Sequence, residues 1–137
     1  MTYAEQEQLE EISDQVKAER RTAIGKAGSF LTVIHRAELA NQMQAQQCPF
    51  SPTQIENVID AIGRDASDDD ADPVNVIRRT LASKSLLGRN RVVSTLFLDQ
   101  LAPKMAEVVK AGLKQRDERI VAAGGPKRPD PPVARYF

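Results

Sequence analysis

The chain of 137 residues contains one cysteine, one histidine and no tryptophan, and aromatic residues make up 4% of it. The single Cys48 excludes an internal disulfide framework and is typical of a reducing compartment. One histidine and one cysteine are too few ligands for a transition-metal cage, so no metal or other cofactor is expected. No run approaches the roughly 20 apolar residues of a membrane helix. The acidic N-terminal sequence is unlike a secretory leader. We therefore expect a protein of the cytoplasm or of an assembled particle, away from membranes.

Sequence patterns of common enzyme sites are missing as well. GxSxG, HExxH, GxGxxG and the Walker loop do not occur. His35 and Cys48 are the obvious candidates for a base and a nucleophile, and neither has a catalytic signature around it. An enzyme is therefore the least favoured class of function.

An acidic run invites a calcium interpretation that its continuation excludes. Asp68, Asp70 and Asp72 match the first three ligand positions of an EF-hand loop. Pro73 and Arg79 then stand where that loop needs a glycine and a bidentate glutamate. We interpret the run as a solvated acidic loop before a helix.

The zero formal net charge hides an uneven distribution of charge. Residues 1–77 contain 14 acidic and 6 basic side chains, whereas residues 78–137 contain 5 acidic and 13 basic ones. This asymmetry indicates either two halves that compensate each other, within one molecule or between copies, or a basic face for nucleic acid or an acidic partner. Compensation is the favoured interpretation.

The first forty residues have the spacing of an amphipathic helix. Thr2 and Glu5 are spaced as in a capping box. Apolar residues then recur every three or four positions, which predicts one long helix or two successive ones. Gly25 and Gly28 each cost about 1 kcal/mol relative to alanine in a helix. We therefore expect a break over residues 25–29, or else a close approach of another helix there. The stripe consists of Leu9, Ile12, Val16, Ala23, Phe30, Val33, Ala37 and Ala40.

Two further helices have clear start signals. Pro49 should end the preceding helix near Gln47. Ser51 as N-cap, Pro52 at the first helical position and Gln54 at the third predict a new start. An acidic loop over residues 64–72 separates this helix from one that begins at Pro73 and closes near residues 86–88. The inward residues are Ile55, Val58, Ile59 and Ile62, with Gly63 as the exit, and then Val74, Ile77 and Leu81.

A final helix is predicted from a cap at Asn90 to Val121 or Ala122. Pro103 should kink it, because proline removes an amide and crowds the preceding turn. Gly112, at the next seam position, packs nothing and weakens the helix, so Leu113 is expected to take over its contact. Residues 92–98 also suit a strand, but their apolar pairs repeat at i, i+4 and favour helix. The seam consists of Leu98, Leu101, Met105 and Val108.

Four prolines within seven residues follow Gly124 and Gly125. They forbid helix and favour an extended polyproline-II arm. The sequence thus predicts an all-α protein with four to five helices in a small bundle, at least one of them long. Residues 1–123 form the helical domain and residues 124–137 the Pro-rich C-terminal arm.

A basic stretch without any acidic residue runs between Val74 and Leu98. Arg89 and Arg91 flank the helix start predicted at Asn90, where free amides would help to bind a phosphate or a carboxylate. The others lie on different flanks of the preceding helix and make no single patch. The stretch fits a helix-turn-helix only with a displaced glycine, and few aromatic residues are available for base stacking. The candidate partner- or anion-binding residues are Arg78, Arg79, Lys84, Arg89 and Arg91.

The C-terminal arm is the second candidate site, because a preformed extended segment loses little entropy on docking and aromatic side chains anchor it well. We expect a non-enzymatic interaction or assembly protein, a homo-oligomeric subunit of a larger complex such as a viral or secretion-type particle. It would dock protein partners through this arm. The alternative is a small DNA-binding protein that uses the basic stretch from Arg78 to Arg91. The docking residues are Pro129, Pro131, Pro132, Arg135, Tyr136 and Phe137.

Overall fold

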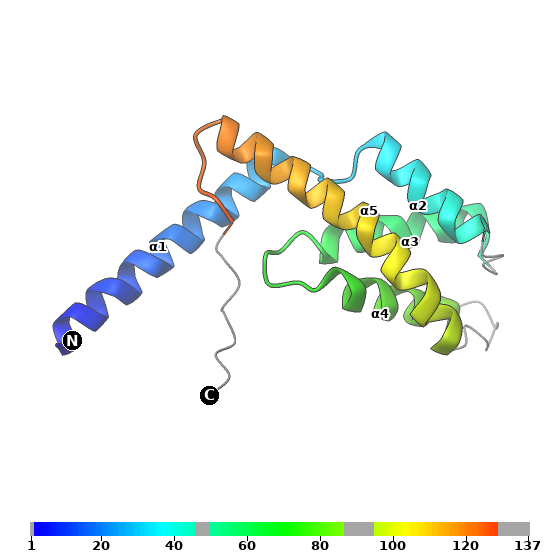
Figure 1. Ribbon diagram of the computed structural model, residues 1–137, viewed down its shortest axis with the longest axis horizontal. Helices are drawn as coiled ribbons and strands as arrows, with labels where there is room; N and C mark the ends of the chain where they lie inside the picture. Colours follow the sequence, from blue (N-terminus) through cyan, green and yellow to red (C-terminus); the bar gives the residue numbers. More distant parts are fainter. Residues whose placement is uncertain (1, 46–49, 87–94, 129–137) are drawn as a thin grey trace. The chain divides into compact units, whose positions relative to one another are not determined.

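The computed structural model describes residues 2–45, 50–86 and 95–128, except the side chains of residues 12, 84–86 and 95–97. In these ranges it contains five α-helices and no strand (Figure 1). The all-α prediction is confirmed, and so is that of a long helix, because α1 has 25 residues and α5 has 28. The helices are α1 (Tyr3–Ala27), α2 (Val33–Ala45), α3 (Pro52–Asp65), α4 (Pro73–Leu86) and α5 (Thr95–Ala122).

The chain forms two compact units that do not follow the order of the sequence. Residues 1–28 and 117–137 make the first unit, and residues 29–116 make the second. The first unit therefore contains α1 and the last turns of α5, whereas the second contains α2, α3, α4 and the longer part of α5. The predicted boundary at residue 123 stays a prediction, although α5 ends at Ala122, as expected.

Both predicted capping boxes are present. At α1, Thr2 Oγ1 accepts the amide of Glu5 at 3.3 Å, and Glu5 Oε2 accepts the amide of Thr2 at 3.2 Å. At α3, Ser51 Oγ accepts the amide of Gln54 at 3.2 Å, and Gln54 Oε1 accepts that of Ser51 at 2.8 Å. Each box satisfies two amides that have no partner inside the helix, which fixes where the helix begins.

The break between the first two helices is confirmed, but the continuous stripe is not. α1 ends at Ala27, and Gly28 follows with a φ of 75°, a conformation that glycine adopts without strain. Because residues 28–32 interrupt the helix, α2 starts a new register. Val33 and Ala37, predicted to face inward, are exposed. The buried residues of α2 are instead His35, Leu39 and Met43.

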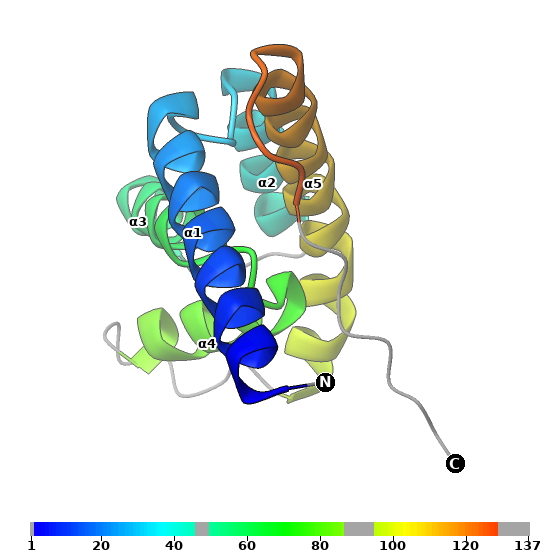
Figure 2. The same ribbon diagram turned by 90° about the vertical axis from the view of Figure 1, so that its left-hand side faces the viewer.

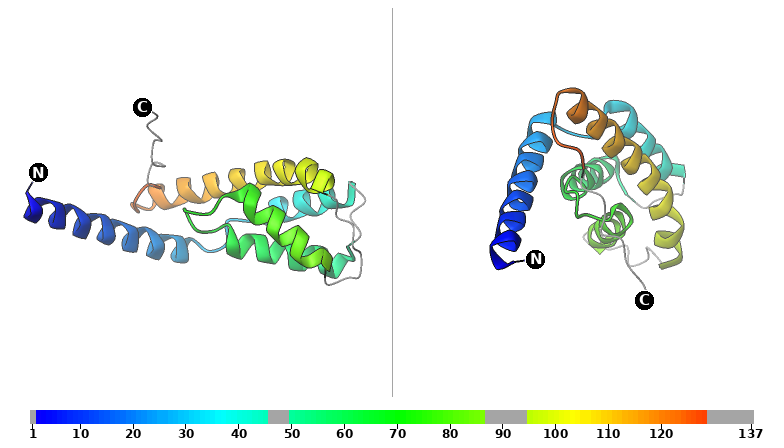
Figure 3. Two further views of the ribbon diagram at one scale, coloured as in Figure 1. Left: turned by 90° about the horizontal axis from the view of Figure 1, so that it is seen from below. Right: turned by 60° about the vertical axis from the view of Figure 1, so that its left-hand side comes forward.

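The core of the second unit forms where three helices and α5 bring their apolar faces together. α3 packs against both α2 and α4 (Figure 1). The two green helices α3 and α4 lie together on one side of the yellow part of α5 (Figures 2 and 3). Each fully buried aliphatic side chain contributes about 1.5–3 kcal/mol. The predicted residues that are buried are Ile55, Val58, Ile59, Ile62, Ile77, Leu81, Leu101, Met105, Val108 and Leu113, while Val74 and Leu98 are half-buried against them.

The helix favoured over a strand for residues 92–98 is confirmed from Thr95 onward, whereas the exit predicted at Gly63 is wrong. Gly63 does not end α3, which continues to Asp65. The strand considered for residues 92–98 is excluded for residues 95–98, because α5 is already helical there. The predicted cap Asn90 lies outside the described residues.

Gly112 has a role that the sequence pattern misjudged. It is buried in α5, and a Cβ atom built there would lie 2.8 Å from the backbone oxygen of Phe30 and 3.1 Å from its ring. The missing side chain therefore lets the chain at Phe30 lie directly on the helix, while Leu113 is buried beside it. Gly112 therefore allows the Phe30 backbone to contact α5 closely and does not leave a gap in the seam.

None of the described helices is both long and apolar enough to cross a membrane.

Candidate interaction surfaces

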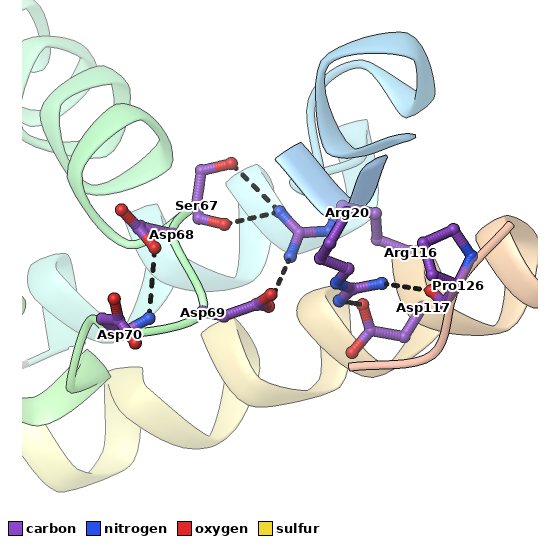
Figure 4. Close-up of polar contacts among 8 residues, drawn as sticks. All are labelled: Arg20, Ser67, Asp68, Asp69, Asp70, Arg116, Asp117 and Pro126. Carbon is purple, nitrogen blue, oxygen red and sulfur yellow. Dashed lines mark hydrogen bonds and ion pairs between the residues drawn. The ribbon is translucent and has the colours of Figure 1, made fainter. Parts of the chain in front are cut away.

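A buried arginine organises the first unit. Arg20 is 2% exposed and forms an ion pair and hydrogen bond with Asp117, at the point where α5 enters this unit (Figure 4). Its Nη1 also donates to the backbone oxygen of Pro126 at 3.2 Å. One guanidinium thus joins α1 to the last turns of α5 and to the segment that follows them. Its planar fork of donors suits two acceptors at once.

The end of α5 is closed by a Schellman motif. The amide of Gly125 donates to Ile120 O at 2.8 Å, and the amide of Gly124 donates to Val121 O at 3.0 Å. Gly124 has a φ of 84°, the left-handed conformation that this motif requires. A Cβ on Gly125 would lie 2.7 Å from Ile120 Cγ2 and 3.6 Å from the Cβ of Ala23. The turn is therefore tight against Ile120 of α5 itself and lies within van der Waals reach of Ala23 in α1.

A groove of about 750 Å³ runs between α1 and this turn. Half of the residues that line it are alanine or glycine, so a backbone or a helix could approach closely. Its charged side chains are Lys26, Arg119 and Glu19, all of them exposed. Lys26 lies in the last turn of α1 and Arg119 in the last turn of α5. The small residues are Ala18, Ala23, Ala27, Ala123, Gly124 and Gly125. We refer to this feature as the small-residue groove.

The first half of α1 carries the second surface of this unit. Every described side chain from Thr2 to Glu19 is exposed. Leu9 and Val16 are separated by two helical turns and share one face, and they are 53% and 40% exposed. On the same face, Arg20 and Ala23 are covered by residues of the C-terminal segment. The stripe is thus covered in its second half and open in its first.

In the second unit, Arg116 fastens α5 to the acidic loop after α3. Its side chain is 1% exposed, and Nη1 donates to Ser67 O at 2.8 Å and Ser67 Oγ at 3.0 Å (Figure 4). Asp69 Oδ1 lies 3.9 Å from Nη2, and the guanidinium carbon lies 5.8 Å from the centroid of the Phe30 ring. This is a structural latch with a cation–π contact.

Two other carboxylates of the acidic loop accept hydrogen bonds from nearby backbone amides. Asp68 Oδ1 accepts the amide of Asp70 at 3.2 Å, and Asp72 Oδ1 accepts the amide of Val74 at the start of α4, also at 3.2 Å. Across the described ranges, no three His, Cys, Asp or Glu side chains gather as metal ligands would. The loop is built as a turn and a helix cap.

His35, one of the two residues considered for chemistry, is an N-terminal capping residue of α2. Its Nδ1 accepts the amide of Thr32 at 3.1 Å, and Thr32 Oγ1 accepts the amide of His35 at 3.3 Å. This exchange has the geometry of a capping box with histidine in place of glutamate. The side chain is buried, and Cys48 lies outside the described residues.

The structure does not bring the predicted basic residues together within the part it describes. Arg78 Nη2 pairs with Asp99 Oδ1 at 3.0 Å, and Arg79 is exposed on α4. Lys84 belongs to α4, but its side chain is not among those described. Arg89 and Arg91 lie outside the described residues, so the anion site and the DNA-binding alternative stay predictions.

The predicted docking residues of the arm also lie outside the described residues. They are Pro129, Pro131, Pro132, Arg135, Tyr136 and Phe137.

Sequence reasoning missed Arg20, Arg116 and Asp117, although the pattern held a signal for both arginines. Arg20 lies on the apolar face of α1, four residues after Val16 and three before Ala23. Arg116 likewise follows the buried Val109 by two helical turns. A cation on an inward stripe requires a buried acceptor, but the pattern alone does not say which one.

No protein-family model matches this chain, and no significant match was found among curated proteins or among solved structures.

Proposed function

We propose that the protein is a non-enzymatic helical assembly subunit, which associates with copies of itself through the open apolar stripe of α1 and belongs to a larger complex. The observation that carries the proposal is the exposure of Leu9 and Val16 on a helix whose first 17 residues are all exposed where their side chains are described. Tyr3, 78% exposed, adds a further apolar side chain near the start of the helix.

Helix energetics support the same proposal. Most helical stability in proteins comes from packing of an apolar face, and the described side chains in the first 17 residues of α1 are all exposed. The capping box at Thr2 stabilises the start of α1, but it contributes only about 1 kcal/mol. A partner that covers Leu9 and Val16 would supply the packing, at about 1.5–3 kcal/mol for each fully buried side chain.

The C-terminal arm, residues 124–137, is the second docking element in this proposal. Its beginning is held in place, because Pro126 O accepts a hydrogen bond from the buried Arg20. An arm anchored at its base searches a smaller volume for a partner protein than a free terminus does, and its prolines reduce the entropy lost on docking. Removal of residues 129–137 should therefore weaken attachment to the larger complex without changing self-association.

Size-exclusion chromatography with light scattering tests the central part of the proposal. The wild-type chain should elute at a mass of at least twice 15.1 kDa, and the stripe variant Leu9→Ser/Val16→Ser should elute as the monomer. Gln8→Ser/Lys17→Ser is the matched control, because both positions are exposed on the same helix but lie away from the stripe. A wild-type monomer at every concentration, or a stripe variant that assembles like the wild type, would refute the proposal.

A further inference from the structure

We propose that residues 3–16 of α1 dock into the small-residue groove of a second copy of the chain, and that the two copies exchange these segments reciprocally. The inference rests on the proposed function, because it names the partner of the same open stripe. Three observations carry it: the charge of the segment, the charge and shape of the groove, and the polarity of the stripe.

The segment is strongly acidic. Residues 3–16 contain five Asp or Glu and no Lys or Arg. Glu7 and Glu11, and likewise Glu10 and Asp14, are four residues apart, so that like charges face each other along the helix. None of these four carboxylates forms an ion pair with another described residue. Such a helix is stabilised by a partner that presents positive charge.

The groove supplies that charge and an apolar floor. Lys26 and Arg119 stand exposed at its rim and outnumber the single acid, Glu19. Neither cation has an ion-pair partner among the described residues. Ala23 and Ala27 are half-buried and Ile120 is buried, so that apolar atoms form the walls and small residues leave room for a helix.

The length of the acidic segment also matches the length of the groove wall. Residues 3–16 extend for about 20 Å as a helix, and so do residues 15–27, which form one wall of the groove. The two halves of α1 are thus a ligand and a receptor of equal length. In a pair of copies related by a two-fold axis, the first half of each α1 can occupy the groove beside the second half of the other α1. Such a closed pair leaves no open copy of this surface for further growth.

The polarity of α1 selects the antiparallel arrangement. Glu5 lies on the stripe face near the N-terminal end, and Lys26 flanks that face near the C-terminal end. A parallel pair would place glutamate against glutamate, whereas an antiparallel pair places Glu5 of each copy near Lys26 of the other. Cross-pairing of opposite charges favours this register, and like charges disfavour the alternative.

Paired charge reversals test the inference on the full chain. The groove variant is Lys26→Glu/Arg119→Glu. The segment variant is Glu7→Lys/Glu10→Lys/Glu11→Lys, which changes residues 3–16 from five negative charges to one positive charge and leaves the Glu5 cap intact. Sedimentation equilibrium should show that each variant alone associates at least tenfold more weakly than the wild type. Their equimolar mixture should associate severalfold more tightly than either variant alone, because each acidic segment then meets a basic groove and each basic segment an acidic one. Recovery should stay below the wild-type affinity, because one of the two Glu5 side chains still faces the reversed charge at position 26.

Circular dichroism of each variant separates loss of helix from loss of association, since Lys26 and Arg119 also lie where cations stabilise a helix end. If a variant loses helix, Lys26→Gln/Arg119→Gln replaces the groove reversal and should weaken association severalfold. The inference alone fails if the wild type self-associates but groove changes leave its affinity unaltered, or if the mixture stays as weak as its parts. A wild type that never self-associates defeats the proposed function together with the inference.

Discussion

Phe30 and Gly112 illustrate how a single missing side chain decides a contact in the second unit. The glycine costs α5 some helix propensity, yet it allows the backbone of Phe30 to lie against the helix. The ring of Phe30 is 1% exposed, and Arg116 stacks its guanidinium over it. One close approach therefore positions both a large core side chain and a buried cation.

Gly112→Ala should destabilise the protein by about 1–3 kcal/mol, because the added methyl group would overlap the Phe30 carbonyl oxygen. Gly25→Ala is the matched control. Gly25 lies inside α1, and a methyl group added there would meet nothing within 4 Å, so this substitution should gain about 0.5–1 kcal/mol. Urea unfolding measures both. Equal effects of the two substitutions would show that helix propensity, and not the Phe30 contact, governs Gly112.

Arg116→Met should cost about 3 kcal/mol, because it leaves Ser67 O and Asp69 without their buried cation. Lys114→Met, at an exposed position of the same helix, should stay within about 0.5 kcal/mol of the wild type. The comparison uses thermal unfolding of the full chain. An Arg116 variant as stable as the Lys114 variant would mean that the latch contributes nothing.

At the scale of the elements, the beginnings of α1 and α3 could be predicted from the sequence. Thr2 and Ser51 can be identified as caps because a capping box involves four consecutive residues and nothing distant. The α3 stripe is equally legible, since all its apolar residues lie on one face. By contrast, Gly63 resembles a helix exit in the sequence, but packing carries the helix on to Asp65.

Ser51→Ala should lower stability by about 1 kcal/mol, whereas Ser51→Gly should lower it by only a few tenths. The hydroxyl accepts the Gln54 amide, and glycine exposes that amide to water better than alanine does. Chemical denaturation of both variants checks the order. If alanine proves as stable as serine, the capping box does not determine the start of α3.

The candidate surfaces are less predictable than the helices. The apolar stripe of α1 is visible as a pattern, but the pattern does not show that residues about a hundred positions later in the chain cover its second half. Likewise, the groove depends on the turn at Gly124 and Gly125, which the sequence pattern places at the beginning of the arm. Contacts between distant residues are a property of the fold, and periodicity does not encode them.

Charge is distributed over the whole molecule in a way that the described ion pairs only partly balance. Asp69 and Arg116 do join the acidic half of the sequence to the basic half. Arg20 and Asp117 join the halves with the signs exchanged, and Arg36 with Asp60 and Arg78 with Asp99 pair within one half each. The acids at the beginning of α1 take part in none of these ion pairs, and their charge is the part that the proposed association would compensate.

Hydrogen exchange of α1, followed by mass spectrometry at low and high protein concentration, tests most directly whether this helix is an association surface. We predict that amides in residues 6–16 exchange quickly in dilute protein and become at least tenfold slower as the concentration rises, with no such change in α3. Exchange in this segment that does not depend on concentration, whether fast or slow, would contradict the account.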